Sequence, residues 1–305
     1  MTQGHASNRN RPGSGVRAAW TVDELPLLPA VVVKLMSLNV DHPAFFEKVL
    51  EVASEDPPLA VRLISLANSA MSSPTCAITD IRMAVSRLGA NRIAGLVTTL
   101  AVTQVFVPTT PGQRKLWQHA LETALIGRFL CQQVRAFNAE PETVYLGGLL
   151  HDVGRFILFR ACSQDIDALD EVDWDAKHTL ADVERAMLGI DHTIVGAKAA
   201  QAWKLPQAIT TVIREHHHYA TNGAPPLTET HAGLTRAVQI ADLVSVHAMP
   251  VHAGAKDRML DELIMAQCIR PVWAAAPVNP TMLSRALPKL AETTQQLMAA
   301  LMLGG

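Results

Sequence analysis

The stretch VYLGGLLHDVG, residues 144–154, decides the fold that this sequence predicts. An apolar helical run ends in His151-Asp152, and we expect Gly154 to stop that helix. A histidine and an aspartate at the end of a buried helix are costly unless they are paired, hydrogen-bonded or bound to a metal. We therefore expect side chains from elsewhere in the chain to partner this pair.

Composition indicates a protein with a large apolar core. The chain has 305 residues, of which 49% are hydrophobic and 18% charged, and its net charge of −2 gives no reason to expect DNA or membrane-surface binding. Its four cysteines form no CxxC pair, so neither a disulfide framework nor a cysteine zinc site is expected. We find no signal-peptide core and no apolar run of membrane-spanning length, and expect a cytoplasmic protein.

Helical periodicity and capping signals recur along the chain, and no period-2 strand pattern or fixed-length repeat is found. Residues 1–18 are rich in Gly, Ser, Asn and Arg and are predicted to be a disordered tail. Helices are predicted within 30–38, 41–53, 56–69, 79–89, 93–100, 114–135, 141–152, 179–189, 191–205, 206–218, 234–246, 257–268 and 281–302.

The best internal boundary is VPTTPG, residues 107–112, which breaks the helical pattern. The sequence therefore predicts an all-α, two-lobed helical bundle. We expect an N-terminal lobe over 19–110 and a second lobe over 111–220, with C-terminal helices over 221–305 completing the second lobe.

Titratable residues on several predicted helices could meet at His151-Asp152. They are His119, His192, the run His216-His217-His218, and Asp242. Imidazole and carboxylate together suit Fe, Mn, Ni or Zn, and two metals that share a carboxylate can generate a hydroxide nucleophile and bind a phosphate. Because adjacent helical residues point about 100° apart, such a site must draw its side chains from different helices.

Each of these residues also has an ordinary structural explanation. His119 could be a half-buried, hydrogen-bonded histidine, and His192 could be solvated in the first turn that Asp191 caps. The histidine run could complement a helix dipole. Asp242 lies between apolar neighbours, so it needs some partner. Phosphate-binding glycine loops and a GxSxG elbow are absent from the sequence.

Together these residues resemble the H…HD…D outline of the HD superfamily, and more specifically its HDOD family. The segments that carry the resemblance are LPLLPAVVVKLMSL (25–38), EDPPLAVRLISLANSA (55–70), AITDIRMAVSRLGANRI (77–93), YLGGLLHDVGRFIL (145–158) and DHTIVGAKAAQAWKLPQAITTVIREHHH (191–218). The resemblance covers residues 25–218 and implies an HDOD domain over about 19–220. HDOD domains resemble HD hydrolases that have lost ligands and become output modules of bacterial signalling proteins.

This chain keeps more ligand positions than that pattern requires, and their order resembles the binuclear HD-GYP phosphodiesterases. The resemblance implies that Asp152 bridges two metals and that a further ligand comes from His216 or His218. The other implied ligands are His119, His151, His192, His217 and Asp242. The register within the triple histidine stays open. Tyr219 stands where HD-GYP enzymes have a glutamate, 225–227 replace their GYP segment, and Lys115 stands where trinuclear members place a glutamate.

The expected function is therefore a bacterial regulatory module that acts through protein–protein contacts, with little or no catalysis and one or two divalent metals as its only cofactor. Residues 68–75 are the expected partner surface. The alternative is a phosphohydrolase acting on a nucleotide or cyclic dinucleotide, in which Asp152 would act with Lys115, Arg155 and Lys198. A third interpretation is a dimerisation module that uses 281–302, although that helix could simply cover the core.

Overall fold

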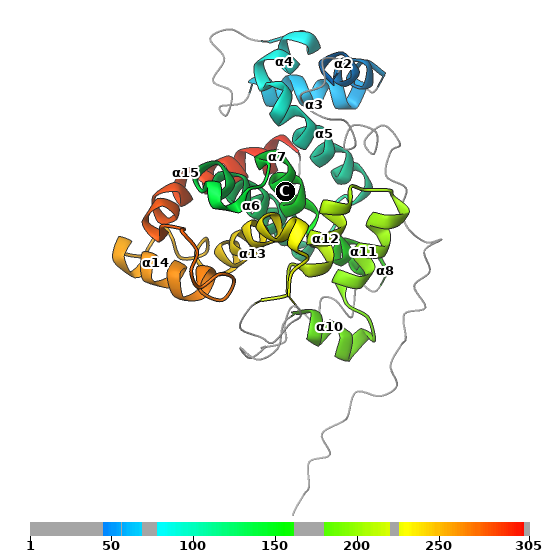
Figure 1. Ribbon diagram of the computed structural model, residues 1–305. Helices are drawn as coiled ribbons and strands as arrows, with labels where there is room; N and C mark the ends of the chain where they lie inside the picture. Colours follow the sequence, from blue (N-terminus) through cyan, green and yellow to red (C-terminus); the bar gives the residue numbers. More distant parts are fainter. Residues whose placement is uncertain (1–44, 56, 69–77, 162–179, 220–225, 302–305) are drawn as a thin grey trace, which may run out of the picture.

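A computed structural model of the chain describes residues 45–55, 57–68, 78–161, 180–219 and 226–301, and every regular element within these ranges is helical (Figure 1). The predicted all-α class is confirmed. The predicted tail over 1–18, the predicted helix over 30–38 and residues 69–75 of the expected partner surface lie outside the described residues. None of the described helices is long and apolar enough to cross a membrane.

Four helices form the N-terminal part of the description: α2 (Phe45–Glu55), α3 (Pro57–Asn68), α4 (Ile81–Leu88) and α5 (Ala90–Val105). Helix α4 begins one residue later than the sequence predicts, because the Asp80 side chain, rather than Thr79, accepts the hydrogen bond from the Arg82 amide. Gly89 ends α4 as predicted, with a φ of 83° that favours glycine. In Figure 1, α2–α4 lie at one end of the molecule and α5 runs from them towards the remaining helices.

The second half is built around α6 (Pro111–Gln133), which the Thr110 side chain caps and Pro111 opens. Helices α7 (Pro141–Leu150), α13 (Ala232–His247) and α15 (Pro280–Ala300) pack against it. The other helices of this half are α8 (Val153–Ala161), α10 (Leu180–Leu188), α11 (His192–Ala202), α12 (Gln207–Glu215) and α14 (Asp257–Leu263), with a π-helical turn η4 at Ile264–Ile269.

Two apolar cores meet at α6. The first joins buried side chains of α2–α5 to α8, α11 and one face of α6 and α7, and includes Trp117 and Leu63. The second lies between α6, α13, η4 and α15, and includes Ile126 and Leu283. Helix α15 contributes to both cores, as expected of a helix that covers the core. Burial on this scale is the main stabilising term of such a bundle.

The HDVG segment differs from the prediction. Helix α7 ends at Leu150, His151 and Asp152 form a turn, and Gly154 lies inside α8 instead of stopping a helix. Glycine is needed there for space, because a Cβ atom at residue 154 would overlap the carbonyl oxygen of His192. The short break between α7 and α8 is what turns His151 and Asp152 into the interior. The residue bounds of the predicted lobes stay a prediction.

Candidate metal centre

Five helices supply the side chains that converge between α6 and α12. His119 lies on α6 and Asp242 on α13, His151-Asp152 follow α7, His192 opens α11, and His216-His217 follow α12. Most of these residues lie at helix ends, whereas His119 and Asp242 lie within α6 and α13. The structure thus brings together all seven residues that the sequence singled out; their role as metal ligands stays a prediction.

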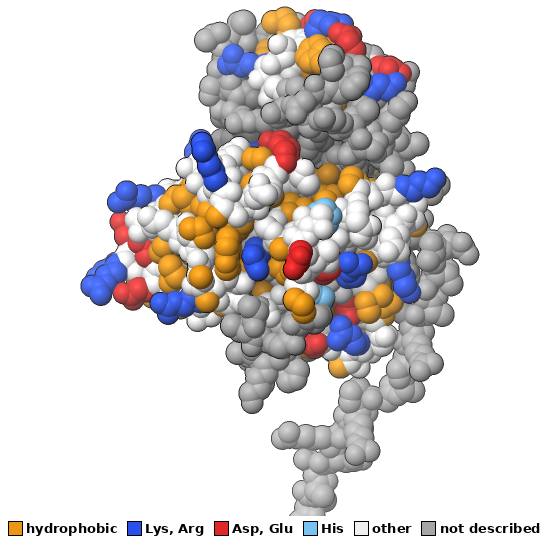
Figure 2. All heavy atoms as spheres, viewed as in Figure 1, with side chains coloured by type: hydrophobic (Ala, Val, Ile, Leu, Met, Phe, Trp, Pro, Cys, Tyr) orange, Lys and Arg blue, Asp and Glu red, His pale blue; other side chains and the backbone are white. Residues whose placement is uncertain are grey.

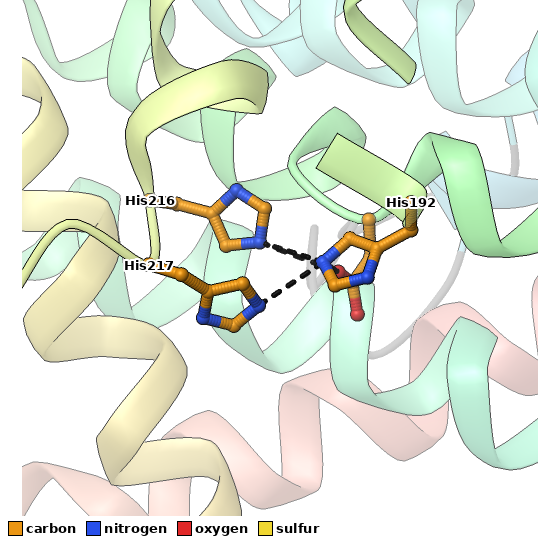
Figure 3. Close-up of side chains that lie close together, drawn as sticks. His192, His216 and His217 are labelled. Carbon is orange, nitrogen blue, oxygen red and sulfur yellow. Dashed lines mark hydrogen bonds and ion pairs between the residues drawn. The ribbon is translucent and has the colours of Figure 1, made fainter. Parts of the chain in front are cut away.

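The first group of donors consists of Asp152, His192, His216 and His217, with one donor atom of each within 4.8 Å of the others. The Nε2 atom of His192 lies 3.2 Å from that of His216 and 3.0 Å from that of His217. Figure 3 shows His216 and His217 both pointing towards the His192 ring. His192 is fully buried, so its alternative as a solvated first-turn residue is wrong.

The second group consists of His119, His151 and Asp242, again with donor atoms within 4.8 Å of one another. The Nε2 atom of His119 lies 3.1 Å from that of His151 and 3.3 Å from Oδ1 of Asp242. His119 retains 19% of its side-chain exposure, and His217 in the first group is also only partly buried, so each group has one member near solvent.

Asp152 stands between the two groups. Its Oδ1 atom lies 3.3 Å from Nε2 of His192 and 3.5 Å from Nε2 of His216. Its Oδ2 atom lies 3.6 Å from Nε2 of His151 and 3.8 Å from Nε2 of His119. A carboxylate with one oxygen facing each of two donor groups is positioned to bridge two cations.

The outer nitrogens of three rings show where the ring protons lie. Nδ1 of His151 lies 2.7 Å from the Gly148 carbonyl, and Nδ1 of His216 lies 2.9 Å from the Ile213 carbonyl. Nδ1 of His192 lies 2.5 Å from Oε2 of Glu184. Carbonyls and carboxylates only accept, so Nδ1 donates in each case, and the Nε2 atom of the neutral ring carries a lone pair.

Hydroxyl groups orient the other two rings in the same way. The Ser245 hydroxyl donates to Glu122 over 2.6 Å, so its oxygen accepts from Nδ1 of His119 at 2.9 Å. The Tyr219 hydroxyl donates to Oδ2 of Asp242 over 3.1 Å and faces Nδ1 of His217 at 3.4 Å. All five Nε2 atoms therefore present lone pairs to one another, an arrangement that a cation satisfies.

The electrostatics of the two carboxylates agree with a cation site. Burial alone would raise the pKa of Asp152 and of Asp242, but the surrounding histidines outweigh it and hold both values below the ordinary range. Both aspartates are therefore ionised at neutral pH.

The neighbours of each histidine decide whether its pKa is raised or lowered. Burial lowers the pKa of His151 to about 4, and burial and nearby histidines hold that of His217 well below its usual value. Burial also lowers the pKa of His119, but the neighbouring Asp242 outweighs it and raises the pKa overall. For His192, Glu184 and Asp152 outweigh burial in the same way.

Sequence reasoning missed the residues that orient the rings: Glu122, Glu184 and Ser245. Tyr219 was noted only as a departure from the HD-GYP pattern. Nothing in their spacing marks them, since their partners are 8 to 126 positions away. Among the described residues, His216 and His217 belong to a donor group and His218 to neither; which of them bind a metal stays a prediction.

Of the three residues predicted to supply positive charge, one contacts a buried carboxylate and two are exposed. Arg155, on α8, lies with its Nε atom 3.4 Å from Oε1 of Glu184. Lys115 on α6 and Lys198 on α11 are exposed. Their catalytic role stays a prediction. On the face drawn in Figure 2, basic and acidic side chains are interspersed.

The HDOD domain family model matches residues 25–219. An uncharacterized protein of Treponema pallidum (strain Nichols) is 25% identical over 225 residues, which is 72% of this chain and 43% of that protein. The chain thus spans less than half the length of this curated relative.

Solved structures show the same fold. An HDOD domain protein with unknown function from Geobacter sulfurreducens is 24% identical, with a TM-score of 0.67 over 90% of this chain and 94% of that one. A protein of Shewanella amazonensis SB2B named "Putative phosphohydrolase" is also 24% identical, with a TM-score of 0.68 over 94% of this chain and 98% of that one.

Proposed function

This chain belongs to the HDOD domain family, and we propose that it is a regulatory module whose seven converging side chains hold a pair of divalent metal ions. The observation that carries the proposal is the set of five Nε2 lone pairs and two ionised carboxylates turned towards one another in a buried space. Unpaired buried acceptors and charges are strongly unfavourable. Metal-binding histidines characteristically donate their outer N–H to an acceptor, as all five do here.

The donor chemistry selects borderline divalent ions. Five imidazoles and two carboxylates suit Fe, Mn, Ni or Zn better than Mg or Ca, which prefer oxygen ligands. The first group would hold one ion through three histidines and Oδ1 of Asp152. The second would hold another through two histidines, Asp242 and Oδ2 of Asp152. The signalling role rests on family membership, and we propose that it is exerted through contacts with a protein partner.

Elemental analysis of protein purified without a histidine tag tests the proposal. We expect about one or two ions per chain, and their loss in Asp152→Ala, because both groups depend on this carboxylate. Asp261→Asn is the matched control: Asp261 is also a structural carboxylate, accepting hydrogen bonds of 2.5 Å from both Thr281 and Ser284. The Asp261→Asn variant should retain the metal.

Absence of metal in the wild type after loading with excess Zn or Mn and desalting would refute the proposal. So would equal metal content in wild type and Asp152→Ala, provided that circular dichroism shows both to be folded.

A second candidate is a phosphohydrolase that acts on a nucleotide or cyclic dinucleotide. The position of Asp152 between two donor groups favours it, as does the fold shared with the Shewanella protein. Two bound ions would supply positive charge to a phosphate and lower the pKa of a water molecule. Hydrolysis of bis-p-nitrophenyl phosphate and cyclic di-GMP by the metal-loaded chain, absent from Asp152→Ala, would support this candidate. Equal background rates in the wild type and Asp152→Ala would contradict the phosphohydrolase candidate and leave the regulatory role as the remaining proposal.

A further inference from the structure

We propose that Glu184 is a positioning residue that fixes the His192 ring with its Nε2 atom turned towards the first donor group. This inference rests on the proposed metal function and deepens it. The residue lies on α10, outside the helices that supply the donors, and was not among the residues that the sequence singled out.

One carboxylate oxygen holds both the ring and the backbone of His192. Oε2 of Glu184 lies 2.5 Å from Nδ1 and 2.8 Å from the backbone nitrogen of His192. His192 is the first residue of α11, so its amide is one of the donors that a helix start leaves without an intrahelical partner. Fixing the backbone and the ring from one oxygen leaves the His192 side chain little rotational freedom.

The Glu184 carboxylate also has a cationic neighbour. Glu184 is fully buried, and its other oxygen, Oε1, lies 3.4 Å from Nε of Arg155 on α8. Arg155 itself follows Asp152 by three residues. The contact therefore connects α8, α10 and α11 around one side of the candidate centre.

Glu184 differs from the groups that orient the other four rings. Those rings face neutral acceptors: the carbonyls of Gly148 and Ile213 and the hydroxyls of Ser245 and Tyr219. The Nδ1 atom of His192, by contrast, is in direct contact with a carboxylate. A carboxylate on the outer nitrogen raises the basicity of the ligand nitrogen. Loss of the charge should therefore weaken the first group selectively, and leave the second group near its original affinity.

The test is a titration of Co²⁺ into the metal-free full chain, followed by absorbance, with Zn²⁺ competition against a chelator to obtain dissociation constants. In Glu184→Gln, which keeps the shape and removes the charge, we expect one of the two ions to bind ~10–100-fold more weakly. Glu184→Asp should bind at a strength between those of the wild type and Glu184→Gln.

Glu215→Gln is the matched control. Glu215 is only 5% exposed and directly precedes His216, but its carboxylate accepts hydrogen bonds from the backbone nitrogen (2.9 Å) and hydroxyl (2.6 Å) of Thr228. Glu215→Gln should lose about as much stability as Glu184→Gln, without a change in metal affinity. Equal affinities in the two glutamine variants would overturn the inference. A wild-type chain that binds no ion would instead refute the proposed function.

A measurement on the wild type covers the case in which Glu184→Gln does not fold. Nitrogen-15 spectra of the zinc-loaded chain, with the His192 signals assigned by their loss in His192→Gln, should show a protonated Nδ1 and a metal-bound Nε2. Zinc on Nδ1, or a proton on Nε2, would overturn the inference.

Discussion

The tautomer of each donor histidine is decided by the acceptors next to its Nδ1 atom. Gly148 and Ile213 supply carbonyls that any residue could supply, whereas Glu184, Ser245 and Tyr219 use their side chains. Single substitutions at the latter positions can therefore change the chemistry of the centre without touching a donor atom.

A residue-scale prediction concerns Cys268, which lies in η4 and is fully buried. Burial, with the nearby Asp242 charge, raises the pKa of its thiol to about 12. Because only the thiolate reacts, a pKa this high leaves roughly one thiol in 10⁴ reactive at pH 8. Burial also raises the pKa of the Cys131 thiol. With Cys76 and Cys162 replaced by serine, the native chain should not react with Ellman's reagent at pH 8.

The same chain unfolded in guanidinium should react with two equivalents of reagent, since Cys131 and Cys268 are then exposed. Raising the pH should increase the native reaction rate, because the thiolate fraction grows as the pH approaches the pKa. Rapid reaction of either thiol in the folded chain at pH 8 would contradict the structure.

At the scale of elements, close crossings of helices place the turn that carries His151 and Asp152. Helix α7 lies so close to α6 that a Cβ atom at Gly148 would come within 2.8 Å of the backbone of Ala124. Gly147, one residue earlier, faces Val212 and Val238 side chains at 3.4–3.5 Å, which is ordinary contact. The two adjacent glycines of α7 thus have different roles.

Alanine substitution separates these roles. Gly148→Ala must push α7 away from α6, and we expect a loss of about 1–3 kcal/mol of unfolding free energy, together with weaker metal binding. Gly147→Ala should be neutral or stabilise by roughly 0.4–1 kcal/mol, because alanine favours the helix and fits the space. Urea denaturation of both variants measures the difference. Equal stabilities would show that α6 and α7 are not this closely packed.

For the whole molecule, the donors join segments that are distant in sequence, from His119 on α6 to Asp242 on α13. The helices that carry the donors belong to both apolar cores: α11 contributes to the first and α13 to the second. Ions bound by the donors connect helices from both cores.

Metal removal should therefore lower the stability of the whole chain. An ion that binds only the folded state adds about 2.7 kcal/mol at 100 times its dissociation constant. Differential scanning calorimetry should show a lower melting temperature after treatment with EDTA and recovery on adding back Zn or Mn. Asp152→Ala should show no such shift. An EDTA shift of the same size in that variant would mean that the stabilising ion binds elsewhere.

Local patterns determined most of the helices and the identity of the donors. Proline and aspartate starts, such as Pro141 and Asp191, depend only on neighbouring residues, and the described helices α7 and α11 begin there. The order of His119, His151-Asp152, His192 and Asp242 is likewise visible in the sequence. The π-helical turn η4 was missed, because its hydrogen-bond pattern has no distinct apolar period.

Only the tertiary structure decided how the donors are oriented and which helices may touch. Gly154, predicted to stop a helix, instead makes room for the carbonyl of His192. Glu184 reaches His192 because α10 packs beside α11, and Ser245 meets His119 across 126 positions of sequence. The physical reason is that helix starts and stops are short-range properties of the backbone. A ring tautomer depends on an acceptor that only the packing of distant helices can supply.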